Sequence, residues 1–385
     1  MYHFIFYSCC VGGLFQLILA CEPITVEDYE DYAKQRLPLA SLEYLQRGAD
    51  KDYTLKRNCE AFSRIKVIPR YLLDVSNRST KAEALGKSFK LPVGIAPSGL
   101  QKRWHPDGEL ATIRASNAAN TIMIVSSASS VSFEDVVKEA PDAEKWMQMF
   151  LFENDSITQD FVKQAEHMRF GAIVVTIDMS VPPLRYFNKR NMWKDVHAMA
   201  NFARYIDEDG RPLQFKFHQA TWIQLQKLIN STNLPVIVKG VVTLEDAILC
   251  YQYGAKGIIV SNHGGRQIDG TISSVSLKVL LSLIEALSDI ISNFRAQFPA
   301  SRNEFEIYLD GGIRSGIDVF RALAIGAKFV FVGRAPLYGL VHSGQQGVEN
   351  VLEIFRRELD TLLGQTGCNS IEDIGTRHVR YQFPF

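Results

Sequence analysis

The sequence predicts one (β/α)8 barrel, a closed ring of eight parallel strands with helices between them. Eight short apolar segments recur along the chain, and helical patterns separate them. Continuous apolar strands alternating with helices are typical of a parallel sheet that is covered on both faces. Eight such units favour a closed barrel over an open, doubly wound sheet, and 385 residues suffice for one barrel with additions. The predicted strands are residues 92–97, 122–127, 145–151, 172–178, 235–240, 257–262, 306–312 and 329–334.

Polar residues and glycines stand late in these eight segments or directly after them. The catalytic face of a barrel lies at the C-terminal ends of its strands. The sequence therefore predicts one site at that face, because core packing alone does not explain polar groups at the same end of every strand. The residues in these positions are Pro97, Ser98, Ser126, Ser127, Gln148, Thr176, Asp178, Lys239, Ser261, His263, Asp310, Gly333 and Arg334.

The barrel, residues 92–385, has a predicted helical extension in front of it over residues 22–91, in which residues 53–91 mix short helical and irregular pieces. Thr25 with Asp28 is a helix start signal, and Pro38 interrupts the helical pattern. Residues 179–234 form a long insertion after the fourth predicted strand. A long connection at the catalytic face is typically a lid or a specificity loop.

Residues 1–21 form an apolar segment whose only ionisable side chains, up to position 20, are those of His3 and of tyrosines and cysteines. Its apolar core resembles a signal peptide, although the usual basic start is missing. A cleaved leader and an uncleaved anchor are equally compatible with it, since about 20 residues can cross a bilayer. Any membrane contact is therefore expected only through residues 1–21.

The composition gives no electrostatic reason to expect a nucleic acid or an acidic protein as a partner. The chain has 42 basic and 42 acidic residues and is 46% hydrophobic, which gives no electrostatic case for binding nucleic acid. Three of its six cysteines fall within residues 1–21, and the others are Cys59, Cys250 and Cys368. Their spacing predicts neither a disulfide framework nor a metal site, and free thiols favour a reducing compartment.

The segment SNHGGRQIDG, residues 261–270, follows the sixth predicted strand. His263 titrates near neutral pH and suits proton abstraction. Arg266 can hold a carboxylate through two parallel hydrogen bonds. A single histidine often has a structural role, but its place among the other strand ends favours a catalytic one.

Glycines and arginines after the seventh and eighth strands predict an anion site, formed by Asp310, Gly311, Gly312, Ile313, Arg314, Gly333 and Arg334. Glycines allow backbone N–H groups to approach a phosphate, which barrels commonly bind at this position. Two tight turns with surface arginines are the alternative.

Lys239, in an apolar strand, needs an anionic partner, such as the side chain of Asp178 or Asp310, or a ligand beside it.

The segments SNHGGRQ, LDGGIRSG, VFVGR, LPVIVKG, IAPSGLQ and LPLASLEYLQRGA together resemble the FMN-dependent 2-hydroxy-acid oxidase family. The resemblance covers roughly residues 24–380. It implies a barrel with preceding helices, FMN as the cofactor, a homotetramer and a peroxisomal location. The C-terminal residues 382–385 are not a peroxisomal tripeptide, and the apolar segment 1–21 suggests the secretory pathway as the alternative.

The resemblance also implies a role for each matching residue. His263 matches the catalytic base and Asp178 its carboxylate partner. Arg266, Arg185 and Tyr44 match residues that bind the substrate. Lys239 matches the lysine beside the flavin ring, and the anion site matches the residues that bind the ribityl phosphate. The remaining cofactor contacts implied by the resemblance are Pro97, Ser98, Gly99, Ser126, Gln148, Thr176 and Ser261.

Three positions of the implied site depart from the glycolate-oxidase pattern. Phe150 stands where the family has a tyrosine whose hydroxyl faces the substrate, which predicts weaker turnover. Ala128 stands where glycolate oxidase has a tryptophan, and Gly99 replaces an alanine beside the flavin. Because both changes remove volume, we expect a pocket that accepts acids larger than glycolate, unless Trp193 or Phe202 of the insertion refills it.

The implied reaction is oxidation of an (S)-2-hydroxy acid to a 2-oxo acid, with oxygen reduced to hydrogen peroxide. A dehydrogenase that uses another electron acceptor would share all of these motifs. A weakly active or non-catalytic flavin-binding protein is a further alternative, which Phe150 favours and the intact His263, Asp178 and Arg266 oppose.

Overall fold

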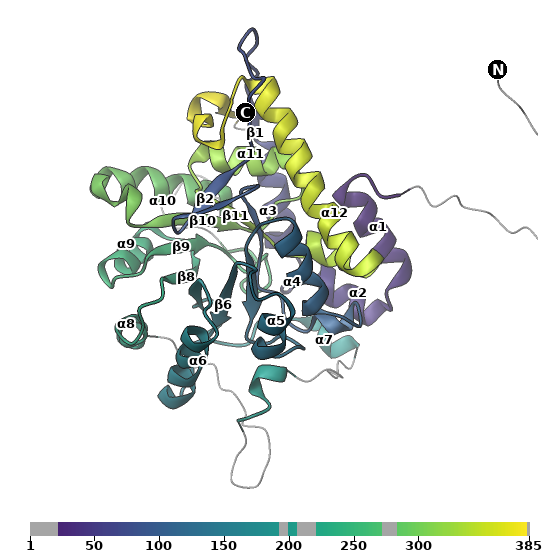
Figure 1. Cartoon of the computed structure of the whole chain (residues 1–385), viewed down its shortest axis with the longest axis vertical. Coiled ribbons are helices and arrows are strands. Elements are labelled where there is room, and N and C mark those ends of the chain that lie inside the picture. Colours follow the sequence, from purple (N-terminus) through teal and green to yellow (C-terminus); the bar gives the residue numbers. More distant parts are fainter. Residues whose placement is uncertain (1–21, 192–198, 206–220, 272–282, 383–385) are drawn as a thin grey trace, which may run out of the picture.

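The computed structural model describes residues 22–191, 199–205, 221–271 and 283–382. Eight parallel strands close into a barrel in the order in which they occur along the chain, which confirms the predicted fold class (Figure 1). Each strand lies within one of the predicted segments except β8, which extends one residue beyond its segment to Val241. The strands are β4 (Val93–Ile95), β5 (Met123–Ser126), β6 (Lys145–Met149), β7 (Ala172–Thr176), β8 (Val236–Val241), β9 (Gly257–Val260), β10 (Glu306–Asp310) and β11 (Val330–Val332).

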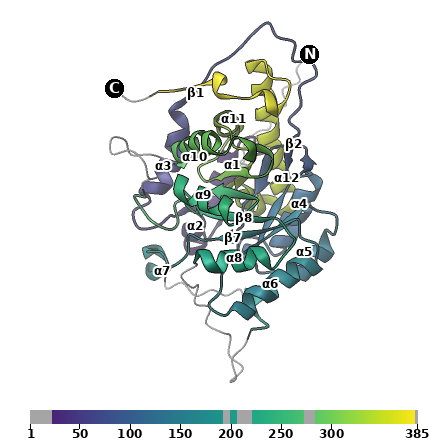
Figure 2. The same ribbon diagram turned by 90° about the vertical axis from the view of Figure 1, so that its left-hand side faces the viewer.

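Helices surround this barrel in both views (Figures 1 and 2). The long α12 lies against α1 and α4, so the last helix of the chain packs beside the first. The helices that follow barrel strands are α4 (Glu109–Ala118), α5 (Phe133–Glu139), α6 (Asp155–His167), α7 (Tyr186–Arg190), α8 (Trp222–Asn230), α9 (Leu244–Gln252), α10 (Leu283–Gln297), α11 (Gly316–Ile325) and α12 (Arg334–Thr366).

Three helices precede the barrel, namely α1 (Val26–Arg36), α2 (Leu39–Gln46) and α3 (Tyr53–Ser63). Thr25 and Asp28 form a reciprocal capping box at the start of α1, and Pro38 separates α1 from α2, as the sequence predicts. The backbone N–H of Ala49 donates to the carbonyl of Gly265 at 2.8 Å. The extension is therefore attached directly to the loop that follows β9.

Two short antiparallel pairs lie outside the barrel. Strand β1 (Ile65–Val67) pairs with β12 (Val379–Tyr381), and β2 (Ala82–Ala84) pairs with β3 (Lys87–Phe89). The sequence pattern predicts only irregular and short helical pieces over residues 53–91, so these strands correct that part of the expectation. Their three-residue length gives too few alternating positions for a recognisable pattern.

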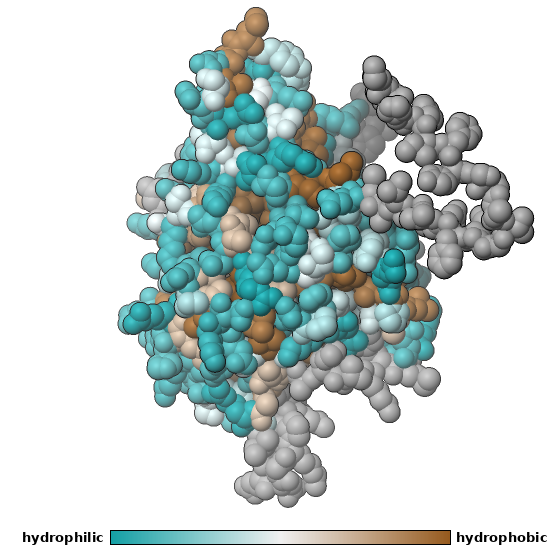
Figure 3. Space-filling model, turned by 45° about the vertical axis from the view of Figure 1, so that its right-hand side comes forward, coloured by the Kyte–Doolittle hydropathy of each residue, from teal (hydrophilic) through white to brown (hydrophobic). Residues whose placement is uncertain are grey.

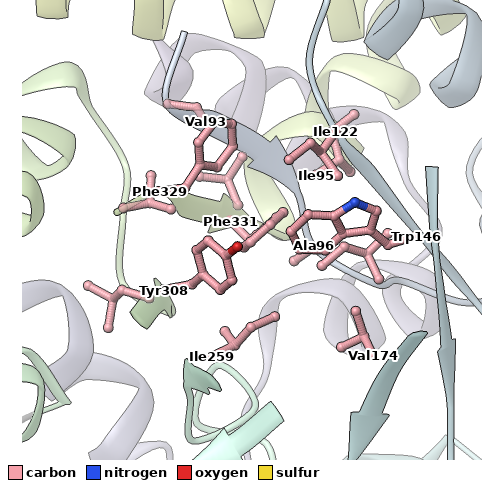
Figure 4. Close-up of a cluster of buried hydrophobic side chains, with 14 of the residues drawn as sticks. Val93, Ile95, Ala96, Ile122, Trp146, Val174, Ile259, Tyr308, Phe329 and Phe331 are labelled. Carbon is pink, nitrogen blue, oxygen red and sulfur yellow. The ribbon is translucent and has the colours of Figure 1, made fainter. Parts of the chain in front are cut away.

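Aromatic and aliphatic side chains pack together in the barrel interior (Figure 4). The ring centroids of Trp146, Tyr308 and Phe331 lie 5.6–5.8 Å apart, and all three side chains are buried. Such contacts add to the burial of the rings themselves. Because this packing fills the interior, the barrel offers a ligand its strand ends rather than a central channel.

The molecular surface is mainly hydrophilic on the face shown in Figure 3, with apolar residues in small groups. None of the described helices is both long and apolar enough to cross a membrane. Cys250 and Cys368 are buried free thiols, whereas Cys59 is exposed. The segment 1–21, Trp193 and the last three residues lie outside the described part of the chain.

Candidate active site

The loop after β9 turns sharply at His263, which has a left-handed φ of 58°. The two glycines that follow also have positive φ values, 64° for Gly264 and 74° for Gly265. A Cβ atom on Gly265 would lie 2.6 Å from the backbone nitrogen of Leu55, so only glycine allows α3 to approach this closely. This turn directs the His263 ring toward the residues that follow β7.

The His263 imidazole is bonded to the Asp178 carboxylate. The distance from Nδ1 of His263 to Oδ1 of Asp178 is 2.9 Å, and the side chains are 25% and 12% exposed. A carboxylate on Nδ1 fixes the tautomer and leaves Nε2 as the ring's free basic nitrogen. The geometry thus brings together the two residues predicted as base and orienting acid.

The surroundings of His263 favour the neutral form of its imidazole. Burial lowers the pKa of His263, and the nearby cations Lys239 and Arg185 lower it further, although Asp178 acts in the opposite direction. Burial alone would raise the pKa of Asp178, but its interaction with His263, through charge when the ring is protonated and through the hydrogen bond, and the charge of Lys239 lower it. An ionised carboxylate beside a neutral imidazole is the arrangement that a general base requires.

We expect the apparent second-order rate constant for the acid substrate to rise with pH as His263 loses its proton. Since burial lowers the pKa of His263 below its ordinary value of 6.5, the midpoint should lie below pH 6.5, with a plateau near neutrality. Asp178→Asn should move the midpoint lower still, because it removes the charge that stabilises the imidazolium. Stopped-flow pH profiles of flavin reduction measure this, and a midpoint above 6.5 would contradict it.

Lys239 on β8 is buried and joins three strand ends. Its Nζ donates to Oγ of Ser261 at 2.8 Å and lies 3.1 Å from Oδ2 of Asp310. Although burial opposes the charge, the charges of Asp310 and Asp178 raise the pKa of Lys239, so the ammonium form is favoured. One oxygen in each carboxylate, Oδ1 of Asp310 and Oδ2 of Asp178, is buried and accepts no hydrogen bond from a described residue. Such oxygens suit the hydroxyl groups of a ligand.

A hydrogen-bonded row of polar side chains crosses β5, β6 and β7. The Gln148 amide accepts from Oγ of Ser126 at 3.2 Å and from the N–H of Ser127 at 3.1 Å, and it donates to Oγ1 of Thr176 at 3.1 Å. All four residues are buried. These contacts fix the side chains before any ligand arrives.

Two glycines of the predicted anion site have backbone conformations and close contacts that disfavour a larger residue. Gly311 and Gly312 have φ values of 94° and 80°, and a Cβ on Gly312 would lie 2.1 Å from the carbonyl oxygen of Asn58. A Cβ on Gly333 would meet nothing closer than 4.0 Å, so its backbone borders open space near Ser98. The residues of this site therefore fit a phosphorylated cofactor, and the acceptors of Asp310 and Asp178 fit a polyol chain and substrate beside it.

The two arginines of the anion site are anchored by the N-terminal extension. Arg334 donates from Nε to the carbonyl of Leu45 at 2.9 Å and from Nη1 to that of Gly264 at 3.1 Å. Burial, together with repulsion from Arg266, lowers the pKa of Arg334 to about 10. Arg314 contacts the carboxylate of Glu30 and lies over the Tyr338 ring, 5.4 Å from its centroid.

Tyr44 of α2 meets the arginines that the sequence assigns to the substrate. The guanidinium carbon of Arg266 lies 4.9 Å from the centroid of the Tyr44 ring, and Nη1 donates to the Tyr44 carbonyl at 2.7 Å. Arg185 donates from Nη2 to the carbonyl of Arg266 at 3.3 Å. Burial and repulsion from Arg185 lower the pKa of Arg266 to about 10. This cationic cluster is suited to an anionic ligand.

The residues at which the sequence departs from its resemblance follow three neighbouring strands, β4, β5 and β6. Phe150 is buried after β6, and Ala128 is half-buried after β5. A Cβ on Gly99 would lie 2.5 Å from the carbonyl oxygen of Ala128. Gly99 is therefore explained by the close approach of the two loops rather than by free volume, and the expectation of a wider pocket depends on Ala128 alone.

Phe202, which the sequence allows as a residue that refills the pocket, has ring contacts with two phenylalanines on the α6 side of the barrel. Its ring lies 5.8 Å from that of Phe152 and 5.6 Å from that of Phe161 on α6.

Two residues at the site were not expected from the sequence, namely Arg103 and Trp104 after β4. Arg103 lies 5.3 Å from the Tyr44 ring and Trp104 lies 6.2 Å from it. Their position after a barrel strand is the signal that could have identified them.

The fold is that of a barrel enzyme, and the geometry of this site suits a phosphorylated cofactor, an anionic substrate and a histidine that acts as a base. The chain belongs to the FMN-dependent dehydrogenase family, which it matches over residues 33–381. It is 38% identical to glycolate oxidase 3 of Oryza sativa subsp. indica over 373 residues, which covers 92% of this chain and 95% of that protein.

Another relative is the peroxisomal (S)-2-hydroxyacid oxidase of Arabidopsis thaliana, which is 36% identical over 367 residues, covering 93% of this chain and 96% of that protein. Among solved structures, a mandelate oxidase variant with (S)-mandelic acid has a TM-score of 0.83 and 33% identity, covering 94% of this chain and 99% of that one. The protein is accordingly an FMN-dependent oxidoreductase.

Proposed function

We propose that this protein oxidises (S)-2-hydroxy acids to 2-oxo acids with FMN and passes the electrons to oxygen, which yields hydrogen peroxide. The His263–Asp178 pair beside the cationic cluster of Arg185 and Arg266 is the observation that carries the proposal. A base next to an anion site suits a substrate that has a carboxylate adjacent to the carbon losing hydrogen.

In this proposal each polar residue has one task. Arg266 and Arg185 hold the substrate carboxylate, and the Tyr44 hydroxyl helps to orient it. The Nε2 atom of His263 takes a proton from the substrate, and Asp178 stabilises the resulting imidazolium. FMN supplies the two-electron acceptor when it is bound.

The cofactor contacts are proposed by the same residue-by-residue match. Lys239 places its charge beside the flavin ring. The glycines of the anion site, with Arg314 and Arg334, hold the phosphate. The remaining proposed contacts are Pro97, Ser98, Gly99, Ser126, Gln148, Thr176, Ser261, Asp310 and Ile313.

Three measurements on the purified protein test the function. The released cofactor should have the mass of FMN, the bound flavin should bleach anaerobically with 2-hydroxy acids, and admitted oxygen should restore the colour with formation of peroxide. Flavin that does not bleach with any acid would contradict the proposal. Reoxidation by a quinone or a cytochrome but not by oxygen would instead identify a dehydrogenase.

We also propose that residues 22–385 form the functional unit and that residues 1–21 are not part of the fold. Thr25 starts α1 with a complete capping box, so that helix needs no preceding residues. Removing residues 1–21 should leave flavin content and melting temperature unchanged. A loss of flavin or a fall of several degrees in melting temperature would place this boundary elsewhere.

The assembly and location of the protein are proposed from its relatives and its sequence. A homo-oligomer, specifically a tetramer, is expected from the family resemblance, and its mass in solution tests this. A peroxisomal location is supported by the peroxisomal relative in Arabidopsis. Imaging the full chain and the chain without residues 1–21 distinguishes this location from the secretory pathway.

A further inference from the structure

The connection after β7 is fastened to the loop after β5 by one buried side chain. Asn201, in the short 3-10 helix Ala200–Phe202, is 4% exposed. Its Nδ2 donates to the Ser127 carbonyl at 3.2 Å and to Oγ of Ser129 at 2.8 Å. Its Oδ1 accepts from the N–H of Phe133 at 2.8 Å. The amide thus binds both ends of the segment 127–133.

Backbone contacts support the same attachment. The N–H of Ala200 donates to the Ser129 carbonyl at 3.0 Å. Phe202 packs independently against Phe152 and Phe161, so the 3-10 helix has its own hydrophobic anchor. Loss of the Asn201 amide should therefore release the β5 loop without detaching the connection from the protein.

A second buried group holds the other side of this loop. The carboxylate of Glu109 on α4 is fully buried, and it accepts from the N–H of Ser130 at 2.9 Å and from its Oγ at 2.6 Å. It also accepts from the N–H of Gln101 at 3.0 Å, while the N–H of Leu100 donates to the Ala128 carbonyl at 3.1 Å. The loops after β4 and β5 are therefore joined to each other.

Ala128 lies between these two anchors. On one side Asn201 bonds the residues at positions 127, 129 and 133, and on the other Glu109 bonds residue 130. The carbonyl of Ala128 itself is held against the loop that contains Gly99. Its Cβ position is thus set by elements far apart in the sequence, because a fully bonded buried network has few alternative arrangements.

We propose that Asn201 is a positioning residue for substrate selectivity: it holds Ala128 where the side chain of a 2-hydroxy acid is bound. This inference rests on the proposed hydroxy-acid oxidation. Glycolate has no side chain to reach Ala128, so its binding should not depend on the loop. The side chain of a larger acid would pack against Ala128, so such an acid loses affinity when the loop that carries Ala128 is no longer fixed.

Asn201→Ala tests the proposal through steady-state kinetics with glycolate and with 2-hydroxyoctanoate. We expect KM for 2-hydroxyoctanoate to rise by about 5–10-fold with little change in kcat, and both constants for glycolate to stay within about twofold. Ser129→Ala should shift the same ratio in the same direction by less. The double variant should not exceed Asn201→Ala, since both changes act on one contact network.

Thr121→Val is the matched control for a general loss of stability. The Thr121 hydroxyl is also buried and donates to the Val93 carbonyl at 2.5 Å, but it lies at the opposite ends of the strands. This variant should destabilise the protein and leave the ratio of the two KM values unchanged. Hydrogen exchange of residues 127–133 in the flavin-loaded protein should be faster in Asn201→Ala and unchanged in Thr121→Val.

The outcomes separate this inference from the proposed function. If the wild-type protein oxidises neither acid, both the proposed function and the role of Asn201 are wrong. If it oxidises them and Asn201→Ala leaves the KM ratio unchanged, only the role of Asn201 is overturned. The same holds if Thr121→Val changes the ratio equally, because the effect would then follow from lost stability.

Discussion

Replacement of His263 by alanine should lower the rate of flavin reduction by at least about 10³-fold and leave FMN bound. The Nδ1 atom of His263 is committed to Asp178 at 2.9 Å, which leaves Nε2 as the base. Among the described residues at this face, Arg266 has a pKa of about 10 and therefore remains protonated near neutral pH, so it cannot replace the base. Anaerobic stopped-flow spectra with saturating substrate measure the loss.

A second variant is needed because alanine adopts the left-handed backbone conformation of position 263 less readily than histidine. The φ of 58° at this position suits histidine and asparagine better than alanine, so His263→Asn removes the base with less strain. Both variants should lose reduction and retain the flavin spectrum. His167→Ala, at the exposed end of α6, should behave as wild type. Normal reduction rates in both His263 variants would exclude this residue from the mechanism.

The sequence was sufficient to predict the barrel because each strand is a short and mainly apolar run. A strand covered on both faces has no polar alternation, and such a run is short enough to be distinguished from a helix when it recurs eight times. The location of the candidate site was predicted from the polar residues at the ends of these strands. In a barrel all strands are parallel, so a polar residue at the end of β9 must lie at the same face as one at the end of β7.

The parts that escaped prediction depend on contacts between distant residues. Ile65 pairs with Tyr381, and no local pattern specifies a partner so far along the chain. The approach of Arg103 to Tyr44 depends on how the N-terminal extension docks over the strand ends. The attachment of Asn201 to the β5 loop is of the same kind, since its partners are defined only once the insertion has folded back.

The second large effect concerns substrate size. We expect acids with medium or long aliphatic side chains, or with aromatic ones, to have higher specificity constants than glycolate. Ala128 is half-buried beside the residues of the cofactor site, and a methyl group there leaves room that an indole would fill. Each buried methylene of the substrate contributes about 0.8 kcal/mol, so two or three shift the preference by roughly 10–50-fold.

Ala128→Trp should therefore suppress the larger acids selectively and leave glycolate oxidation nearly intact. Specificity constants for glycolate, 2-hydroxyoctanoate and mandelate measure this directly, and Ala128→Ser, which adds little volume, is the matched control. A clear preference of the wild-type protein for glycolate, with little change in Ala128→Trp, would mean that Ala128 does not line the pocket. Because the Ala128 carbonyl is held by Leu100 and its neighbours by Asn201, the loop cannot simply move aside for the indole. The added ring must then occupy the space that the substrate side chain would use.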